Sequence, residues 1–285
     1  MQFLFVAIEC YEKELNIFTT NCKQIPLLYN NLGNSYYYNN QYDKSIENYE
    51  KALKISPDIF GTNHSDVARS YHGLGASYGN NNQYDKSIEN YEKALKIRLD
   101  IFRTNHSDVA RSYHGLGASY DNNKQYDKAI ENYEKALKIS LDIFGTNHSD
   151  VARSYHGLGI SYRNNKQYDK SIENYEKALE IRLDIFGTNH PDVANSYHNL
   201  GISYRNNNQY DKAIENYEKA LKIRLDIFGT NHSDVANSYN GLGISYRNNR
   251  QYDKSIEYDE KALKIRKELF GDTDRSVGDS NWNLG

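Results

Sequence analysis

The chain repeats itself at a fixed interval of 42 residues, and this period constrains its fold more than any other feature. The phrase Gln-Tyr-Asp-Lys begins at six evenly spaced positions, Gln41, Gln83, Gln125, Gln167, Gln209 and Gln251. Periods of about 20–50 residues are typical of solenoids, in which each unit buries its apolar face only against its neighbours. The unbroken register predicts a single array over residues 1–285 without an internal domain boundary.

Each repeat contains two apolar patterns with helical spacing. In the copy that starts at Ser65, a first helix is predicted by apolar residues that step by four, three and four positions, at Val67, Tyr71, Leu74 and Tyr78. Ser65 is the expected N-cap, whereas in the copy with Pro191 the proline suits the first turn and His190 takes the cap position. Residues 79–82, Gly-Asn-Asn-Asn, should end this helix because Gly and Asn tolerate the left-handed conformation of a helix exit.

A second helix is predicted to open near Asp85, whose acid favours the positive end of the helix dipole. Its apolar stripe consists of Tyr84, Ile88, Tyr91, Leu95, Leu99 and Phe102. The repeat arithmetic gives helix pairs at 23–60, 65–102, 107–144, 149–186, 191–228 and 233–270, after a leading truncated helix at 1–18 and before a truncated last repeat at 274–285. We therefore expect an all-α chain of about fourteen helices.

Both ends interrupt a repeat in the middle. Phe3, Phe5 and Ile8 at the start and Trp282 at the finish would leave apolar surface that another repeat normally covers. We expect either a fragment or an imperfect gene model of a longer array, and a chain that associates end to end.

The first-helix run Tyr-His-Gly-Leu-Gly-Ala-Ser-Tyr at 71–78, followed by Ser87, Tyr91 and Ala94, resembles the tetratricopeptide pattern. The longer tail, with Ala-Leu-Lys-Ile-Arg, Gly-Thr-Asn-His and Pro-Asp-Val-Ala within 191–236, resembles the 42-residue kinesin light chain class. This resemblance implies a right-handed superhelix of antiparallel helix pairs whose concave groove binds a peptide or partner protein. Two alternatives stay open: a cargo adaptor of kinesin light chain type, and a regulatory sensor arm of a larger multidomain signalling protein.

The composition argues against several other classes of function. Lys and Arg number 35 against 38 Asp and Glu, so no overall basic field favours nucleic acid or an anionic membrane. Cys10 and Cys22 are too few for a disulfide scaffold, and no apolar run reaches the length of a membrane span. The apolar opening lacks a basic region and a small-residue cleavage site, so it is not a signal peptide. We expect a cytoplasmic protein without nucleic-acid or membrane partners.

Metal, cofactor and enzyme sites find no support in the sequence. Five histidines lie in the connectors, His64, His106, His148, His190 and His232, where capping or loop roles are expected. Equivalent residues of stacked helices lie roughly 10 Å apart, too far to share a zinc ion. The Gly-Leu-Gly at 73–75 lies inside a helix and is not followed by Gly-Lys-Ser/Thr, so it is not a phosphate loop. No nucleophile–base pair stands out, and we predict a protein that is not an enzyme.

The face of the first helix opposite the Tyr71–Leu74–Tyr78 stripe is the expected ligand groove. Its candidate residues share three registers: Arg69, Arg111 and Arg153; Asn30, His72, His114, His156, His198 and Asn240; and the pairs Ile160 with Arg163, Ile202 with Arg205, and Ile244 with Arg247. The resemblance implies that asparagines in the second register hold a peptide backbone, and the four histidines depart from that pattern.

The third register admits two interpretations. The isoleucines either help neighbouring first helices to pack or offer apolar contacts to a ligand. Each arginine lies about one turn from its isoleucine and supplies a fork-shaped cation, which favours a ligand with alternating acidic and apolar residues. The copies are nearly identical even at exposed positions, which recent duplication also produces, so similarity between copies is not evidence of function.

Overall fold

The structure is a computed structural model that describes residues 2–17, 23–275 and 277. These residues fall into two compact units, Met1–Gly145 and Thr146–Gly285. The first unit holds α1 (Gln2–Ile17), α2 (Gln24–Tyr38), α3 (Tyr42–Phe60), α4 (Ser65–Asn80), α5 (Tyr84–Phe102), α6 (Ser107–Asn122) and α7 (Tyr126–Phe144). The second holds α8 (Ser149–Asn164), α9 (Tyr168–Phe186), α10 (Pro191–Asn206), α11 (Tyr210–Phe228), α12 (Ser233–Asn248) and α13 (Tyr252–Phe270).

The predicted all-α class and the helix pairs are confirmed, since these thirteen helices and no strand make up the regular structure of the described ranges. Most of the predicted last repeat at 274–285 lies outside those ranges, as do the side chains of Phe3, Phe5 and Trp282. Ile8 is buried against Leu32 and Tyr36, so it does not leave the apolar surface expected of it. A single array over residues 1–285 stays a prediction.

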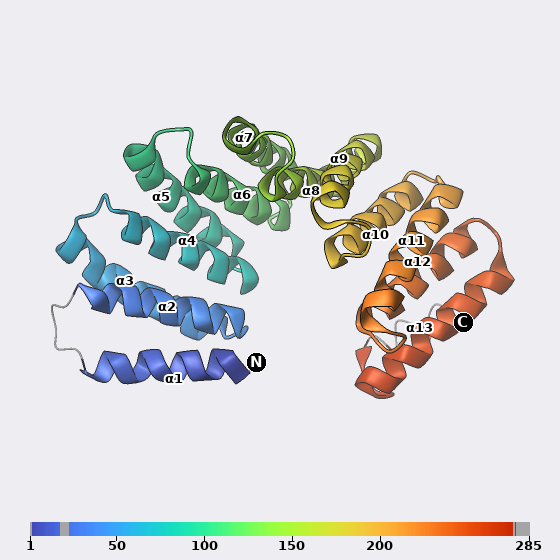
Figure 1. The fold of residues 1–285 in the computed structure, drawn as a ribbon, viewed down its shortest axis with the longest axis horizontal. Coiled ribbons are helices and arrows are strands. Elements are labelled where there is room, and N and C mark those ends of the chain that lie inside the picture. The colour runs from blue at the N-terminus through green and yellow to red at the C-terminus, as the bar shows by residue number, and fades with distance from the viewer. Residues whose placement is uncertain (1, 18–22, 276, 278–285) are drawn as a thin grey trace. The chain divides into compact units, whose positions relative to one another are not determined.

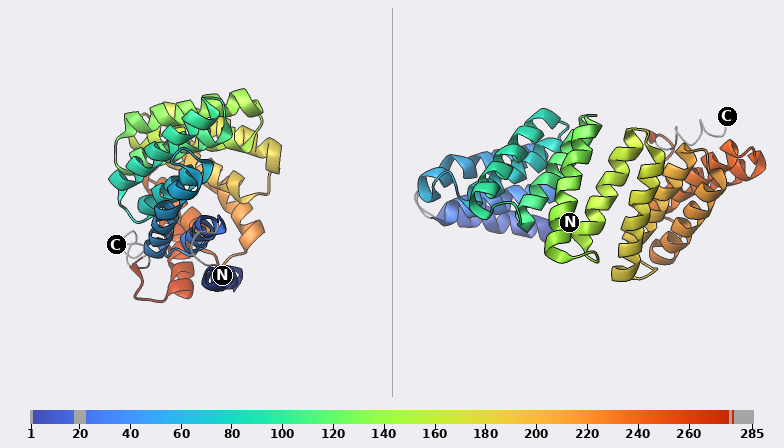
Figure 2. Two further views of the ribbon diagram at one scale, coloured as in Figure 1. Left: turned by 90° about the vertical axis from the view of Figure 1, so that its left-hand side faces the viewer. Right: turned by 90° about the horizontal axis from the view of Figure 1, so that it is seen from above.

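Within each unit, consecutive helices lie side by side (Figure 1). We call α2, α4, α6, α8, α10 and α12 the first helices and the others the second helices. Each first helix packs on the second helix of its own repeat, and α4, α6, α10 and α12 also pack on the second helix before them. First helices contact one another directly in the pairs α2–α4, α4–α6 and α10–α12. Figure 2 shows the same neighbours from two other sides.

A buried tyrosine on the second helix sets how closely the helices approach. Tyr91 of α5 lies between α4 and α6, and it contacts the backbone of both at a glycine. A Cβ atom on Gly75 would lie 2.8 Å from the Tyr91 ring, and one on Gly115 would lie 2.4 Å from it. Tyr49 and Tyr217 meet glycines of two first helices in the same way. In α4 and α6, two glycines therefore make room for two tyrosine rings, one from each neighbouring second helix.

This arrangement explains Gly73, a helix-interior glycine that costs about 1 kcal/mol relative to alanine. A Cβ atom there would lie 2.2 Å from Cζ of Tyr49. Two copies carry asparagine in this register, Asn31 and Asn199. The Asn199 side chain donates to the Asn195 carbonyl and accepts from Arg163. The other register, that of Gly75, holds glycine in all six copies.

We expect Gly75→Ala to lower the free energy of unfolding by about 1–3 kcal/mol, because the added methyl group overlaps the buried Tyr91 ring. Gly79→Ala is the matched control, since other copies carry Asp121 or Arg163 in its register and alanine there gains up to about 1 kcal/mol of helix propensity. Urea unfolding followed by circular dichroism measures both, and an equal stability of the two variants would refute the packing argument.

The connector histidines begin the first helices. His64 is the N-cap of α4, and its Nδ1 accepts the backbone N–H of Asp66 at 3.2 Å. The ring also stacks on Phe60, the last residue of α3. The expected N-cap at Ser65 is therefore wrong by one residue, because the imidazole supplies the acceptor. The cap at His190 with Pro191 in the first turn is confirmed.

The connector after α5 contains a strained residue. Arg103 has φ 60° and ψ −159°, a conformation that only glycine adopts without strain. The other connectors carry glycine at this position, as at Gly187 with φ 73° and ψ −174°.

We expect Arg103→Gly to raise the free energy of unfolding by about 1–3 kcal/mol through the release of this strain. The reverse change, Gly187→Arg, should lower it by a similar amount. Thermal and urea unfolding measure both. If neither substitution changes stability, the backbone at residue 103 is not strained.

Candidate functional site

Buried arginines on second helices connect the first helices of adjacent repeats. Arg98 of α5 reaches Nδ1 of His72 on α4 at 3.1 Å. The same guanidinium nitrogen lies 2.7 Å from Oγ of Ser112 and 3.1 Å from the carbonyl oxygen of Asp108, both on α6. A guanidinium only donates, so all three partners act as acceptors. Arg98 thus joins α4 to α6 through polar contacts inside the packing.

The second unit repeats this arrangement twice. Arg182 of α9 contacts Nδ1 of His156 at 3.3 Å and Oγ of Ser196 at 2.6 Å. Arg224 of α11 contacts Nδ1 of His198 at 3.2 Å and Oγ of Ser238 at 2.8 Å. In α7 this register holds Ser140, so His114 has no arginine at that position.

These contacts fix the hydrogen position on the histidine rings. Because the arginine donates to Nδ1, a neutral imidazole carries its hydrogen on Nε2. Burial and the neighbouring Arg98 lower the pKa of His72 to about 3, and burial with Arg224, Arg205 and Arg163 does the same for His198. No residue in the described part of the chain bonds Nε2 of His72 or His198. Each ring therefore keeps one N–H donor for another partner.

The predicted ligand residues differ in accessibility. Asn30 is fully buried, and its Oδ1 accepts from Oγ of Ser70 at 2.7 Å, so it lies inside the packing of α2 and α4 rather than in a groove. That part of the predicted site is wrong, because the Asn30 side chain is buried and bonded to Ser70 of the next first helix. His114, His156 and Asn240 are partly buried, as are His72 and His198.

The arginines of the first predicted register are already paired. Arg69 donates to Oδ1 of Asn31 at 3.0 Å, and Arg111 forms an ion pair with Asp108 at 2.8 Å. Arg153 is ion-paired with Asp150 one turn earlier on α8. The charges of Arg111 and Arg153 are balanced by carboxylates of their own unit, whereas Arg69 is bonded to a neutral amide.

The isoleucines of the third register serve the packing. Ile160 and Ile202 are partly buried against the apolar cluster that contains Tyr175, Leu200 and Tyr217. Ile244 is partly buried as well. The packing interpretation therefore holds for Ile160 and Ile202, and the ligand interpretation of this register rests on its arginines.

Two of those arginines, Arg163 and Arg205, lie around His198. Arg163 and Arg205 both lie close enough to lower the pKa of His198. Arg163 donates to Oδ1 of Asn199 at 3.1 Å and lies over the Tyr175 ring at 6.0 Å. Arg247 of α12 lies near the buried Asp259; burial raises the pKa of this carboxyl and Arg247 partly offsets the increase. We call the surface formed by Arg163, Arg205, Arg247 and His198 the arginine face.

Arg163 and Arg205 differ from Arg111 and Arg153 of the first register, because no described carboxylate forms an ion pair with either of them. Two neighbouring cations without an acidic partner repel each other, and an anion placed between them would relieve that repulsion. The arginine face is therefore a candidate anion-binding surface.

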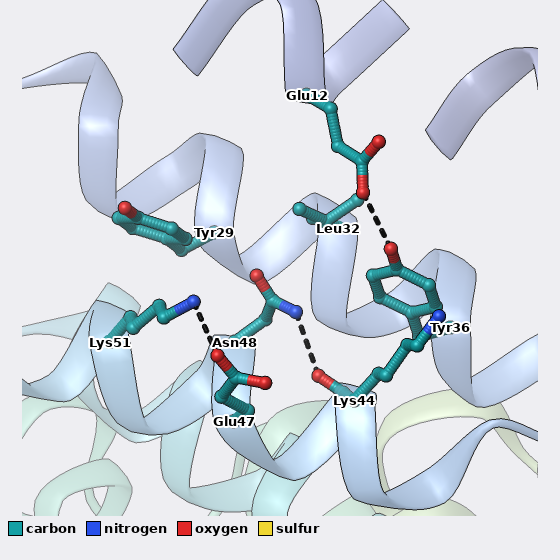
Figure 3. A pocket seen from close by; sticks show the side chains of 8 residues that line it. All are labelled: Glu12, Tyr29, Leu32, Tyr36, Lys44, Glu47, Asn48 and Lys51. Atoms are coloured by element: carbon teal, nitrogen blue, oxygen red, sulfur yellow. Dashed lines mark hydrogen bonds and ion pairs between the residues drawn. The ribbon is translucent and has the colours of Figure 1, made fainter. Parts of the chain in front are cut away.

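A hollow lies between α1, α2 and α3, apart from the arginine face (Figure 3). Its volume is about 560 Å³, and it is lined by Glu12, Tyr29, Leu32, Tyr36, Lys44, Glu47, Asn48 and Lys51. The Tyr36 hydroxyl donates to Glu12 at 2.6 Å, and burial with this carboxylate raises the Tyr36 pKa to about 12. Lys51 pairs with Glu47 at 2.6 Å.

The same set of side chains recurs along the chain as a seam between helices. Tyr78 donates to Glu50, Lys86 lies over the Tyr78 ring and Lys93 pairs with Glu89. In later copies the tyrosine reaches a glutamate 28 residues earlier, but Tyr36 reaches Glu12, only 24 residues earlier. The hollow is therefore a version of this seam in which α1 packs in a shifted register.

The described residues contain no group of three or more His, Cys, Asp or Glu side chains arranged to hold a metal ion. No helix in the same ranges is both long and apolar enough to cross a membrane.

The family model of the tetratricopeptide repeat matches residues 24–100, 74–142, 108–164 and 150–226, and a second such model matches 235–276. The chain therefore belongs to the tetratricopeptide repeat family, as the sequence resemblance implied. Its repeats are of the kinesin-light-chain-like kind, and proteins of this family are generally noncatalytic scaffolds that bind other proteins. No curated protein sequence matches the chain.

The solved structures that are similar to it include the following three. A putative kinesin light chain with nearly identical repeats from Podosopora anserina is 26% identical, with a TM-score of 0.65 over 73% of this chain and 98% of that one. BtubC from P. vanneervenii is 24% identical, with a TM-score of 0.66 over 81% and 90% of the two chains. The apo form of RapI is 18% identical, with a TM-score of 0.69 over 93% and 92%. The last two show the fold alone.

The histidine environment predicts how stability depends on pH. The pKa of His72 and His198 is lower in the folded chain, about 3, than the ordinary 6.5. The unfolded chain therefore binds more protons between these values, so stability falls as the pH drops below 6.5 and is unaffected above it.

We expect the double variant His72→Asn/His198→Asn to lose less stability than the parent protein as the pH falls. The difference in unfolding free energy should be up to about 1 kcal/mol per pH unit for each histidine replaced. Asparagine is the natural residue of this register at Asn240. Urea unfolding at about pH 7.5 and about pH 5.5 measures the effect, and the carboxylates contribute equally to both proteins. An unchanged pH dependence would mean that the rings protonate normally in the folded state.

Proposed function

We propose that this chain is a noncatalytic scaffold that binds an acidic segment of a partner protein on the arginine face of α8, α10 and α12. The observation that carries the proposal is the pair Arg163 and Arg205, which lie around His198 without a carboxylate partner among the described residues. A bound carboxylate would accept forked hydrogen bonds from such a guanidinium.

The arginines of the first register provide the contrast within the same chain. Arg111 and Arg153 already have aspartate partners. A ligand would have to displace those partners, which offsets the gain of the new contact. Binding should therefore depend on the third register and very little on the first.

A cargo adaptor of kinesin light chain type is a second candidate, favoured by the similarity to the putative kinesin light chain repeats. It is compatible with the same face, since a cargo could supply the acidic segment. A regulatory sensor arm of a larger signalling protein stays an alternative without a specific observation in its favour. Copurification with a motor subunit would favour the adaptor.

The test uses a triple variant in which Arg163, Arg205 and Arg247 are each replaced by Glu. Its binding to a fluorescent peptide of alternating Glu and Leu is measured by anisotropy. We expect the triple variant to bind at least about tenfold more weakly, because each lost charge-assisted hydrogen bond is worth about 1.5–3 kcal/mol. Raising the salt concentration should weaken binding to the parent protein.

Arg69→Glu with Arg111→Glu is the matched control and should change the affinity by less than about twofold. Circular dichroism should show the same helix content in all three proteins. Equal affinity of the triple variant and the parent would remove the arginine face from the proposed function.

A further inference from the structure

The arginine face offers two kinds of ligand-binding group, an arginine that recurs once per repeat and a histidine N–H on α10. The cations are Arg163, Arg205 and Arg247, one on each of the three first helices of the second unit. The donors are histidine N–H groups, of which His198 Nε2 has no partner in the described chain. A ligand that uses both kinds of group must present acids and acceptors with the same spacing as the helices.

The helix spacing defines that period. The first helices α10 and α12 contact each other directly, and packed helices have axes about 8–10 Å apart. One turn of a polyproline II segment contains three residues and advances about 9 Å, so every third residue returns to the same side. In a β-strand the same side recurs every two residues, or about 7 Å, which does not match.

An α-helical ligand matches the spacing of the first helices at every seventh residue, about 10 Å, but its backbone offers no acceptor to the histidine N–H. Its main-chain carbonyls already accept internal hydrogen bonds and are not available to an imidazole N–H. A polyproline II segment has no internal hydrogen bonds, so its carbonyls are open acceptors. The N–H of His198 therefore separates the two ligand conformations that the arginine spacing alone allows.

Arg224 makes this donor well defined without touching the ligand. It holds Nδ1 of His198 at 3.2 Å and is itself bonded to Ser238 Oγ and, at 2.9 Å, to Oδ1 of Asn195. The ring can neither flip its tautomer nor turn away without losing the arginine contact. Burial beside Arg224, Arg205 and Arg163 also keeps the His198 pKa far below neutral pH, so the donor is a neutral imidazole.

We propose that the arginine face binds a polyproline II segment with an acidic side chain at every third residue, and that His198 Nε2–H donates to a main-chain carbonyl of that segment. The inference rests on the proposed function and specifies the ligand of the same site. The arginines bind the acidic side chains, and the histidine recognises the backbone conformation between them.

The test compares three peptides of identical Glu, Pro and Ala composition, in which the glutamates are spaced by three, two or seven residues. Binding to the full chain is measured by isothermal titration calorimetry. We expect the three-residue spacing to bind at least about tenfold more tightly than the others, since only it satisfies successive arginines with an open backbone.

Each outcome decides a different claim. Equal binding of all three peptides would overturn the periodic ligand and leave the acidic-segment function standing. Preference for the seven-residue spacing would show that the ligand is helical and would also overturn the inference. If no acidic peptide binds, the proposed function fails together with it.

His198→Phe tests the donor. We expect it to weaken binding of the peptide with glutamates every three residues by about twofold to tenfold, which is the effect of losing a neutral hydrogen bond. His114→Phe is the matched control, because Ser140 replaces the arginine behind it and it lies in the first unit. If His198→Phe disturbs the fold, Arg224→Ser replaces it, a change that copies Ser140 and frees the ring. Unchanged affinity in the folded variant would show that His198 does not contact the ligand.

Discussion

The tyrosine ring that five second helices, α3, α5, α7, α9 and α11, pack on the bare backbone of a first helix is the contact on which the rest of the structure depends. Tyr91 lies between glycines of α4 and α6, and Tyr217 between glycines of α10 and α12. A large planar side chain against Cα atoms brings helices closer than two opposing side chains would. This closeness sets the distance between successive first helices, and with it the spacing of every group that a ligand could contact.

The same closeness places polar groups where they must be satisfied. Arg98, Arg182 and Arg224 enter the packing from second helices, and each finds a histidine on one first helix and a serine on the next. Burial of a charge is costly unless hydrogen bonds compensate it, so these acceptors are required by the fold. As a consequence the rings of His72 and His198 keep one tautomer and one free donor. A structural requirement thereby shapes the candidate binding surface.

The sequence predicted the helices well because their apolar stripes, Asn-rich exits and fixed period all indicate the same boundaries. It failed where a residue has two uses: Ser65 has a capping side chain but His64 occupies the cap, and Asn30 shares the register of His72 but is fully buried. The arginines behind the histidines were missed, because Arg98 and Arg224 fall in an otherwise apolar row and resemble part of the family tail. In this register serine, at Ser56 and Ser140, alternates with arginine, and that polar pattern could have indicated a buried polar role. Which charges are already paired, as at Arg111, needs three-dimensional contacts.

The central claim is that the buried Arg224 holds His198 of the arginine face as a neutral Nε2–H donor. The most direct measurement is a nitrogen-15 nuclear magnetic resonance titration of the imidazole rings, with Arg224→Ser used to assign His198. The account predicts that, near pH 6, Nδ1 of His198 has the shift of an unprotonated acceptor and Nε2 that of a protonated nitrogen, with no titration down to about pH 4. Averaged shifts for the two nitrogens, or protonation near the ordinary pKa of 6.5, would contradict it.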